Sequence, residues 1–115
     1  MTQFAYLEIQ GRTTDFVTAI DGTVMHGLAP IYVVRDLPGI EAFRVVQESL
    51  GRTRVEVVPE NELPDATRET IVHGMRERLG ENVDVDVEIV AEIPREPSGK
   101  YRYVKSRVPT EETRG

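Results

Sequence analysis

Two short polar segments near the ends of the 115-residue chain hold the residues best suited to chemistry. Residues 11–17 read GRTTDFV, with an arginine and an aspartate, and residues 97–103 read PSGKYRY. In the second segment, Ser98 and Gly99 predict a flexible turn that presents Lys100 at the edge of a sheet. Glycine lets the backbone approach a ligand closely, and the lysine ammonium is a compact charge that suits phosphate or carboxylate oxygens. From these residues alone, an anion-binding turn and an ordinary surface turn with a solvated lysine both remain open.

The charge distribution favours a small anionic ligand over a long polyanion. The whole chain has a formal net charge of −6, whereas nucleic-acid binding needs a dense basic surface for phosphate contacts. Residues 95–107 are locally basic, with a single acid, Glu96, against five basic residues: Arg95, Lys100, Arg102, Lys105 and Arg107. A basic tip on an acidic body attracts a small anion, so we expect no nucleic-acid partner.

The composition excludes several other classes of site. The chain has no cysteine, which rules out disulfides and thiolate zinc sites. Its two histidines, His26 and His73, are too few and too far apart in sequence to predict a metal site. No apolar run is long enough to cross a membrane, and residues 1–10 (MTQFAYLEIQ) lack the basic start and apolar stretch of a secretory signal. We therefore expect a cytoplasmic protein with no membrane partner.

The elements that would position the two segments begin with a hairpin and a helix. Asp21-Gly22 lies between short apolar runs at residues 16–20 and 24–25, and Asp-Gly tolerates the positive φ angles of tight hairpin turns. Pro30 suits the first turn of a helix, where its missing N–H costs nothing. The buried stripe of that helix would comprise Ile31, Val34 and Leu37. Pro38-Gly39 would end it.

Strands are predicted in three places. Two stretches with apolar residues indicate an antiparallel pair that turns at Gly51 and stops at Pro59: Phe43, Val45 and Val46 in the first, and Val55, Val57 and Val58 in the second. Residues 83–93 alternate apolar with mainly acidic side chains, which is typical of a strand with one face in the core and one in water.

A second helix lies between these strands. Pro64-Asp65 opens it, with Asp65 as the expected N-cap, and Gly80 stops it. Its core face would comprise Ile71, Val72, Met75 and Leu79. Gly74 weakens a helix by about 1 kcal/mol relative to alanine, so we expect close packing at that position.

With the second arm of the hairpin counted as a sheet strand, the order of elements is βαββαβ. This is the ferredoxin-like α+β arrangement, with two helices on an antiparallel sheet and a β-hairpin before them. We expect residues 1–10 to be a linker or first strand, residues 11–108 to form one mobile domain, and residues 109–115 to be a disordered tail. Domains of this fold serve many roles, so the function depends on the two polar segments.

Taken together, the two segments resemble the C-terminal domain of the adenylate-forming superfamily, in particular phenylacetate-CoA ligases and the related CapK-like proteins of capsular polysaccharide clusters. In that superfamily a Gly-Arg-x-x-Asp stretch marks the crossing from the large to the small domain, and a Pro-Ser-Gly-Lys loop carries the adenylation lysine. The run DLPGI at residues 36–40 is also similar. The resemblance covers residues 7–108. It departs from the family at Thr14, where many relatives carry a second acidic residue.

The resemblance implies a role for each residue of the motifs. Lys100, on the loop with Ser98 and Gly99, would be the catalytic lysine that contacts the substrate carboxylate and the α-phosphate region of ATP. Arg12 would reach the ribose hydroxyls of the adenylate, and Asp15 would be the hinge about which the domain rotates. Simpler alternatives are a surface ion pair for Arg12 and a turn-capping carboxylate for Asp15.

The resemblance also implies that most of the enzyme lies elsewhere. ATP or AMP and Mg would bind a large N-terminal adenylation domain, supplied in cis or in trans. The substrate would be a small-molecule carboxylate, and coenzyme A is the expected acceptor. The chain by itself would be a catalytically incomplete part of an AMP-forming acid–thiol ligase, with no tightly bound cofactor and no metal site. The alternative is a free-standing ferredoxin-like module that binds a small effector or a partner subunit.

Overall fold

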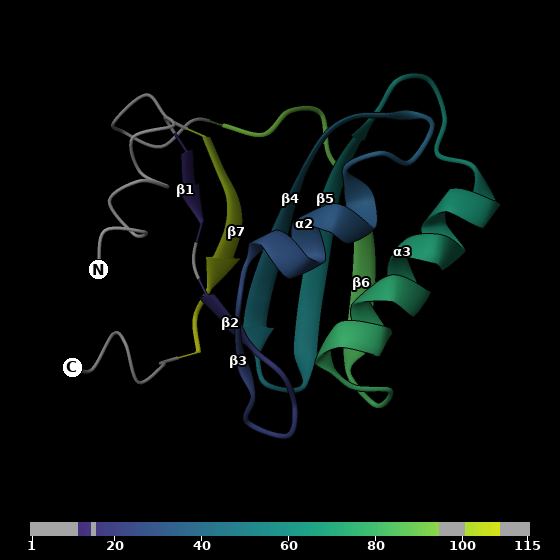
Figure 1. Ribbon diagram of the computed structural model, residues 1–115. Coiled ribbons are helices and arrows are strands. Elements are labelled where there is room, and N and C mark those ends of the chain that lie inside the picture. Colours follow the sequence, from purple (N-terminus) through teal and green to yellow (C-terminus); the bar gives the residue numbers. More distant parts are fainter. Residues whose placement is uncertain (1–11, 15, 95–100, 109–115) are drawn as a thin grey trace.

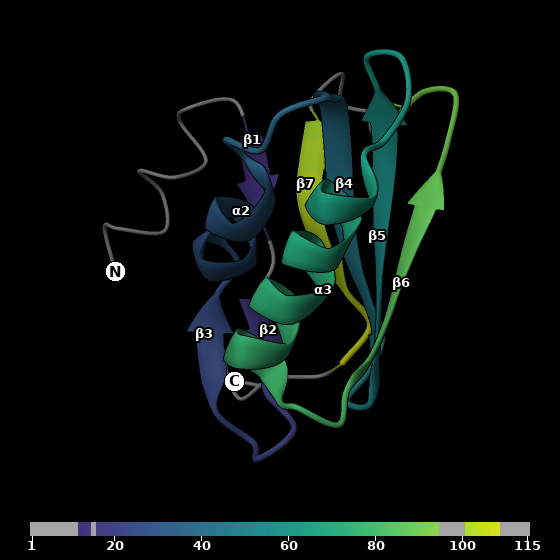
Figure 2. The same ribbon diagram turned by 90° about the vertical axis from the view of Figure 1, so that its right-hand side faces the viewer.

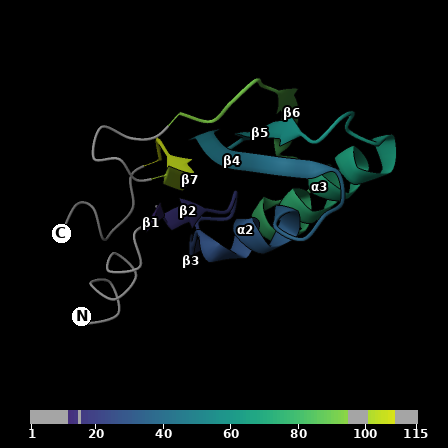
Figure 3. The ribbon, with the colours of Figure 1, turned by 90° about the horizontal axis from the view of Figure 1, so that it is seen from above.

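In the computed structural model, two helices and a hairpin lie on one face of a five-stranded sheet, within the part of the chain that the structure describes (Figure 1 and Figure 3). That part comprises residues 12–14, 16–94 and 101–108. The sheet has the strand order β1-β7-β4-β5-β6, and the hairpin pairs β2 with β3. The elements are β1 (Arg12–Thr14), β2 (Phe16–Thr18), β3 (Val24–His26), α2 (Leu28–Val34), β4 (Ile40–Ser49), β5 (Arg52–Pro59), α3 (Asp65–Leu79), β6 (Asp84–Ile89) and β7 (Tyr101–Ser106).

The α+β class, with two helices and a preceding hairpin, is confirmed and is consistent with a ferredoxin-like domain. The strand directions are mixed instead of antiparallel throughout. β4 and β5 are antiparallel, whereas β1–β7, β4–β7 and β5–β6 are parallel pairs. The second arm of the hairpin does not enter the sheet, because β7 occupies the place beside β4 and sets Val104 opposite Val45. β3 pairs with β2 alone.

The strand predicted at residues 83–93 is shorter in the structure, and a further strand follows it. β6 ends at Ile89, opposite Val57 of β5. The Val90 N–H still donates to the Val57 carbonyl (2.9 Å), but β5 ends at Pro59, which has no N–H to extend the ladder. The final strand is therefore β7, which lies between β1 and β4.

The hairpin forms where Asp21-Gly22 predicts it. Gly22 has a φ of +96°, a conformation that favours glycine. The Ala19 N–H donates to the Thr23 carbonyl at 2.7 Å and closes the turn. The Asp21 carboxylate accepts the Thr23 N–H at 2.9 Å, and this hydrogen bond lowers the pKa of Asp21. The residue types of the turn thus fix its geometry.

The two helices pack side by side (Figure 2). The close approach expected at Gly74 is confirmed, because a Cβ placed there would lie 2.6 Å from Cγ1 of Val33 on α2. Gly80 ends α3 with a φ of +136°. Asp65 is the first helical residue and not the expected N-cap, which is Pro64, and no side chain caps this end of the helix.

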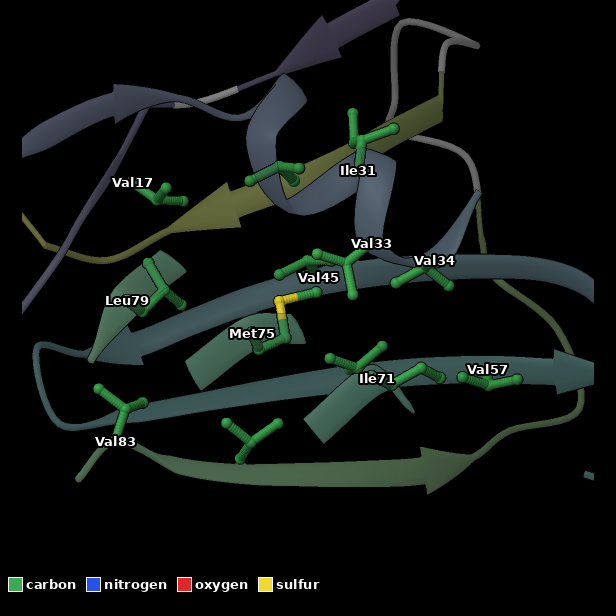
Figure 4. Packing of buried hydrophobic residues seen from close by; sticks show 13 residues of the cluster. Val17, Ile31, Val33, Val34, Val45, Val57, Ile71, Met75, Leu79 and Val83 are labelled. Carbon is green, nitrogen blue, oxygen red and sulfur yellow. The ribbon is translucent and has the colours of Figure 1, made fainter. Parts of the chain in front are cut away.

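One hydrophobic core joins the helices, the sheet and the hairpin (Figure 4). Ile71, Met75 and Leu79 of α3 are fully buried, which confirms the predicted face of that helix. They share a cluster with Val45 of the sheet and Val17 of β2. The hairpin therefore belongs to the same packed unit as the sheet, although it pairs with none of its strands.

The opposite face of the sheet carries a network of ion pairs, which we call the charged ladder: Arg44, Glu48, Arg54, Glu56 and Arg107. Side chains alternate between faces along a strand, so the neighbours of the core valines in β4 and β5 project away from the helices. Glu56 lies at the centre, with Arg44 at 2.8 Å and Arg54 at 3.3 Å.

Within the described residues, no helix has the length and apolarity needed to cross a membrane.

Candidate functional site

The parallel pairing of β1 with β7 brings the two sequence motifs side by side. Arg12, in the first motif, lies opposite Tyr101, which directly follows Lys100 in the sequence. The side chain of Arg12 lies outside the described residues, as do Ser98, Gly99 and Lys100. The predicted roles of these residues therefore stay predictions. The described parts of the motifs, in Arg12–Thr14 and Tyr101–Ser106, lie on neighbouring strands at one edge of the sheet.

The predicted hinge position stands between two strands of different sheets. β1 ends at Thr14 in the five-stranded sheet, and β2 begins at Phe16 in the hairpin. Asp15 itself lies outside the described residues, so its hinge role also stays a prediction. The packed unit begins directly after it, since the Phe16 ring meets the His26 ring edge-on with centroids 5.3 Å apart and Val17 is fully buried.

A pocket of about 630 Å³ lies where the second motif joins the fold. Ala91 to Ile93, which precede that motif in the sequence, and Tyr103, its last residue, line the pocket. The remaining wall comes from α2, from the start of β4 and from the end of β5: Ile31, Arg35, Glu41, Ala42, Phe43 and Val58. We call this feature the motif-side pocket.

The motif-side pocket combines an aromatic wall with a charged rim. The rings of Phe43 and Tyr103 are tilted against each other with centroids 5.8 Å apart, and Tyr103 packs against the core. Arg35, which lines the pocket as do Glu41 and Glu92, is exposed, and its guanidinium lies 5.5 Å from the centroid of the exposed Tyr32 ring. The lining thus combines apolar and aromatic side chains with three charged ones.

Sequence reasoning did not predict this pocket, because its lining comes from several elements that are distant in the chain. Alternate residues of a strand share a face, and of the tyrosines at positions 101 and 103 in β7 the structure describes Tyr103, whose ring packs against the core. The side chain of Tyr101 lies outside the described residues.

Each histidine contacts a neighbouring group of the fold, Leu28 in the case of His26 and Glu77 in the case of His73. The His26 Nδ1 accepts the Leu28 N–H (3.1 Å) at the start of α2, and burial lowers the pKa of this imidazole, which favours its neutral form. His73 is exposed on α3, with Nε2 3.2 Å from a carboxylate oxygen of Glu77. Within residues 12–14, 16–94 and 101–108, no group of three or more His, Asp or Glu side chains is arranged to hold a metal ion.

The described residues thus form an α+β domain in which Arg12 of the first motif and Tyr101 of the second lie on paired strands. Residues 18–107 match the family model described as the CapK C-terminal domain. The match spans most of the chain, so this protein belongs to that family. A search of curated proteins found no match.

Two solved structures are similar to this chain. One is a domain of phenylacetate-coenzyme A ligase from Bacteroides vulgatus ATCC 8482, with a TM-score of 0.56 and 13% identity over 84% of this chain and 95% of that one. At this identity the likeness shows the fold alone. The other is acetoacetyl-CoA synthetase from Streptomyces lividans, with a TM-score of 0.49 and 24% identity over 70% of this chain. The match spans 13% of the synthetase.

Proposed function

We propose that this chain is the mobile C-terminal domain of an ATP-dependent, AMP-forming carboxylate ligase and supplies its adenylation lysine, Lys100. Support comes from the match to the CapK C-terminal domain family. The pairing of Arg12 with Tyr101, the neighbour of Lys100, carries the proposal furthest, because a lysine and an arginine that serve one nucleotide must approach it from the same edge of the domain. The setting would be a cytoplasmic pathway such as capsular polysaccharide synthesis.

Each motif residue has a physical task in this proposal. Negative charge gathers at the α-phosphorus as pyrophosphate leaves, and the Lys100 ammonium stabilises it. Arg12 donates to the ribose hydroxyls of the adenylate. Reorientation about Asp15 brings a different face of the domain to the site for thioester formation. ATP and Mg bind an adenylation domain supplied in cis or in trans, and coenzyme A accepts the acyl group.

The two half-reactions of the ligase test the role of Lys100. In the polypeptide or complex that contains the adenylation domain, Lys100→Ala should slow acyl-adenylate formation by at least about 100-fold, as expected when one positioned charge is lost. Thioester formation from preformed acyl-adenylate should keep its rate. Lys105→Ala is the matched control, since Lys105 is a lysine of β7 that lies five residues further along the chain, and it should spare both steps. Equal loss of both half-reactions in Lys100→Ala would remove Lys100 from this role.

The isolated chain provides a second test. It should fold but form no acyl-adenylate from ATP and a carboxylate, because the adenine pocket and the Mg site belong to the other domain. Turnover by the 115-residue chain alone would contradict the domain assignment.

The motif-side pocket favours one alternative, a binding module that acts with a partner subunit. If that alternative holds, a small ligand should bind the isolated chain and protect the residues around Phe43 and Tyr103. Lys100→Ala should then have no effect on either half-reaction. A reading frame that continues upstream through an ATP-binding domain would count against it. Copurification with a separately encoded adenylation domain would favour action in trans.

A further inference from the structure

Gln47 of β4 is a fully buried amide that binds the hairpin to the sheet. Its Nε2 donates to the Thr18 carbonyl at 2.6 Å, and its Oε1 accepts the Thr18 N–H at 3.0 Å. The same oxygen also accepts the Ser106 hydroxyl at 2.8 Å. Gln47 is 0% exposed and Thr18 is 6% exposed. One carboxamide thus joins β2, β4 and β7.

This arrangement reproduces a strand pairing with a side chain. A peptide group in a sheet offers one N–H and one C=O to its neighbour, and the Gln47 carboxamide offers the same pair to Thr18. β2 has no ladder partner in the five-stranded sheet, so the carboxamide satisfies backbone groups that would otherwise be buried without partners. Leaving such groups unpaired costs about 1–3 kcal/mol each.

Two residues close to Thr18 in the sequence also attach the hairpin to the rest of the fold. Val17 is fully buried in the common core, and the Ile20 N–H donates to the Leu79 carbonyl at the end of α3 at 2.7 Å. Residues 17, 18 and 20 are thus each attached to another element. Gln47 supplies the polar part of this attachment.

From these contacts we infer that Gln47 is a positioning residue that clamps the hairpin and the sheet into one rigid body. The rigid body then begins at Phe16, and any reorientation relative to a preceding domain is confined to the chain before that residue. The clamp stands on the described contacts. Its bearing on domain motion rests on the proposed function.

Amide hydrogen exchange of the 115-residue chain tests the clamp. The Ala19 N–H, bonded inside the hairpin at 2.7 Å, reports on the hairpin, and the Val45 N–H reports on the sheet. In Gln47→Leu, we expect exchange at Thr18 and Ala19 to accelerate at least about tenfold more than exchange at Val45, because the hairpin opens separately. An equal acceleration at all three amides would mean a general loss of stability and would overturn the clamp.

Gln47→Glu introduces a side chain of nearly the same shape and adds a pH-dependent test. A neutral carboxyl can donate to the Thr18 carbonyl and accept its N–H, whereas a carboxylate cannot donate. The ratio of exchange at Ala19 to exchange at Val45 should therefore fall towards the wild-type ratio as the introduced carboxyl is protonated at low pH. Gln47→Leu serves as the control and should show no such recovery. If the ratio of exchange at Ala19 to exchange at Val45 does not change with pH in Gln47→Glu, the inference is contradicted.

These exchange measurements need no catalytic activity, so a failed Lys100 test would leave their outcome intact. In the polypeptide with the adenylation domain, Gln47→Leu should slow the passage from adenylate to thioester more than it slows adenylation. If Gln47→Leu loosens the hairpin but leaves both half-reactions unchanged, the clamp is supported and its link to domain reorientation is contradicted.

Discussion

At the scale of single residues, Gly74 sets how closely the two helices approach. A Cβ at this position would meet the Cγ1 of Val33 at 2.6 Å, and valine is too stiff at χ1 to turn aside freely. The glycine weakens α3 locally by about 1 kcal/mol. Tight contact between α2 and α3 offsets that weakness.

We predict that Gly74→Ala destabilises the domain by about 1–2 kcal/mol, since overpacking exceeds the gain in helix propensity. Urea denaturation measures the change. On a Val33→Ala background the same substitution should be neutral or stabilising by up to about 1 kcal/mol. Identical effects on both backgrounds would exclude steric contact as the cause.

His26 makes the stability of the domain depend on pH. Burial lowers the pKa of its imidazole from the ordinary 6.5, so the unfolded chain binds a proton more readily than the folded one. The contribution of His26 is fully present above pH 6.5 and is lost as the pH falls through the folded pKa. Protonation would also abolish the acceptor for the Leu28 N–H.

We therefore predict that acidification from about pH 7.5 to about pH 5.5 lowers the free energy of unfolding less in His26→Gln than in the wild type. Urea midpoints at the two pH values provide the measurement. His73→Gln, at an exposed position, should keep the wild-type pH dependence. A wild-type slope in His26→Gln would show that other groups cause the effect.

Residues with a strong local signature were predictable from the sequence, and Gln47 was not. Gly22 and Gly80 stand where positive φ angles are needed, and their neighbours reveal this. Gln47 follows Val46 and precedes Glu48 in β4, and its partners Thr18 and Ser106 lie far away in sequence. The pattern of a single strand carries no information on such partners.

At the scale of elements, the charged ladder explains how β4 and β5 present one face without helical cover. Arg44 and Glu56 pair across the two strands at 2.8 Å, with side chains 16% and 11% exposed. Arg54 bridges Glu48 and Glu56. Ion pairs at this depth are shielded from water more than surface pairs, so loss of one member leaves a poorly solvated charge.

We predict that Glu56→Leu costs about 2 kcal/mol of stability, between the values for exposed and buried pairs. Arg44→Met combined with Glu56→Leu should cost less than the sum of the two single changes. Arg52→Met is the control, because the Arg52 side chain is 51% exposed in its pairs with Asp84 and Asp86, and it should cost less than about 0.5 kcal/mol. Additive effects in the Arg44–Glu56 cycle would show no coupling.

The elements themselves were predictable wherever their patterns are local. The hairpin, both helices and the β4–β5 pair follow from turn residues and apolar spacing. β7 was less visible, because a short, mostly polar and basic strand (YRYVKS) gains its place through Val104, whose partner Val45 is distant in the chain. The mixed strand directions follow from that long-range pairing.

At the scale of the whole molecule, one core serves both sheets. Val17 of the hairpin and Ile71 of α3 belong to the same buried cluster. The net charge of the chain is −6, whereas residues 95–107, around the second motif, hold five basic residues and one acid. The candidate site could be predicted as two motifs, whereas the pocket beside them required the folded arrangement.

We predict a single cooperative unfolding transition, because the described helices, sheet and hairpin share one hydrophobic core. Far-UV circular dichroism reports the helices, and tyrosine fluorescence reports sites that include Tyr103. The two urea curves should coincide in the wild type. Separate midpoints would indicate that the hairpin or the β1–β7 edge unfolds independently.

The shortness of β1 affects how far this domain could move away from a preceding one. β1 forms the outer edge of the sheet with three residues, and its register to β7 shifts between Thr13 and Thr14. Peeling this strand away would leave the rest of the fold in place and would lengthen the tether to any preceding domain by about 10 Å, at roughly 3.3 Å per extended residue. Up to three residues of β1 could thus be added to the connection between this domain and a preceding one.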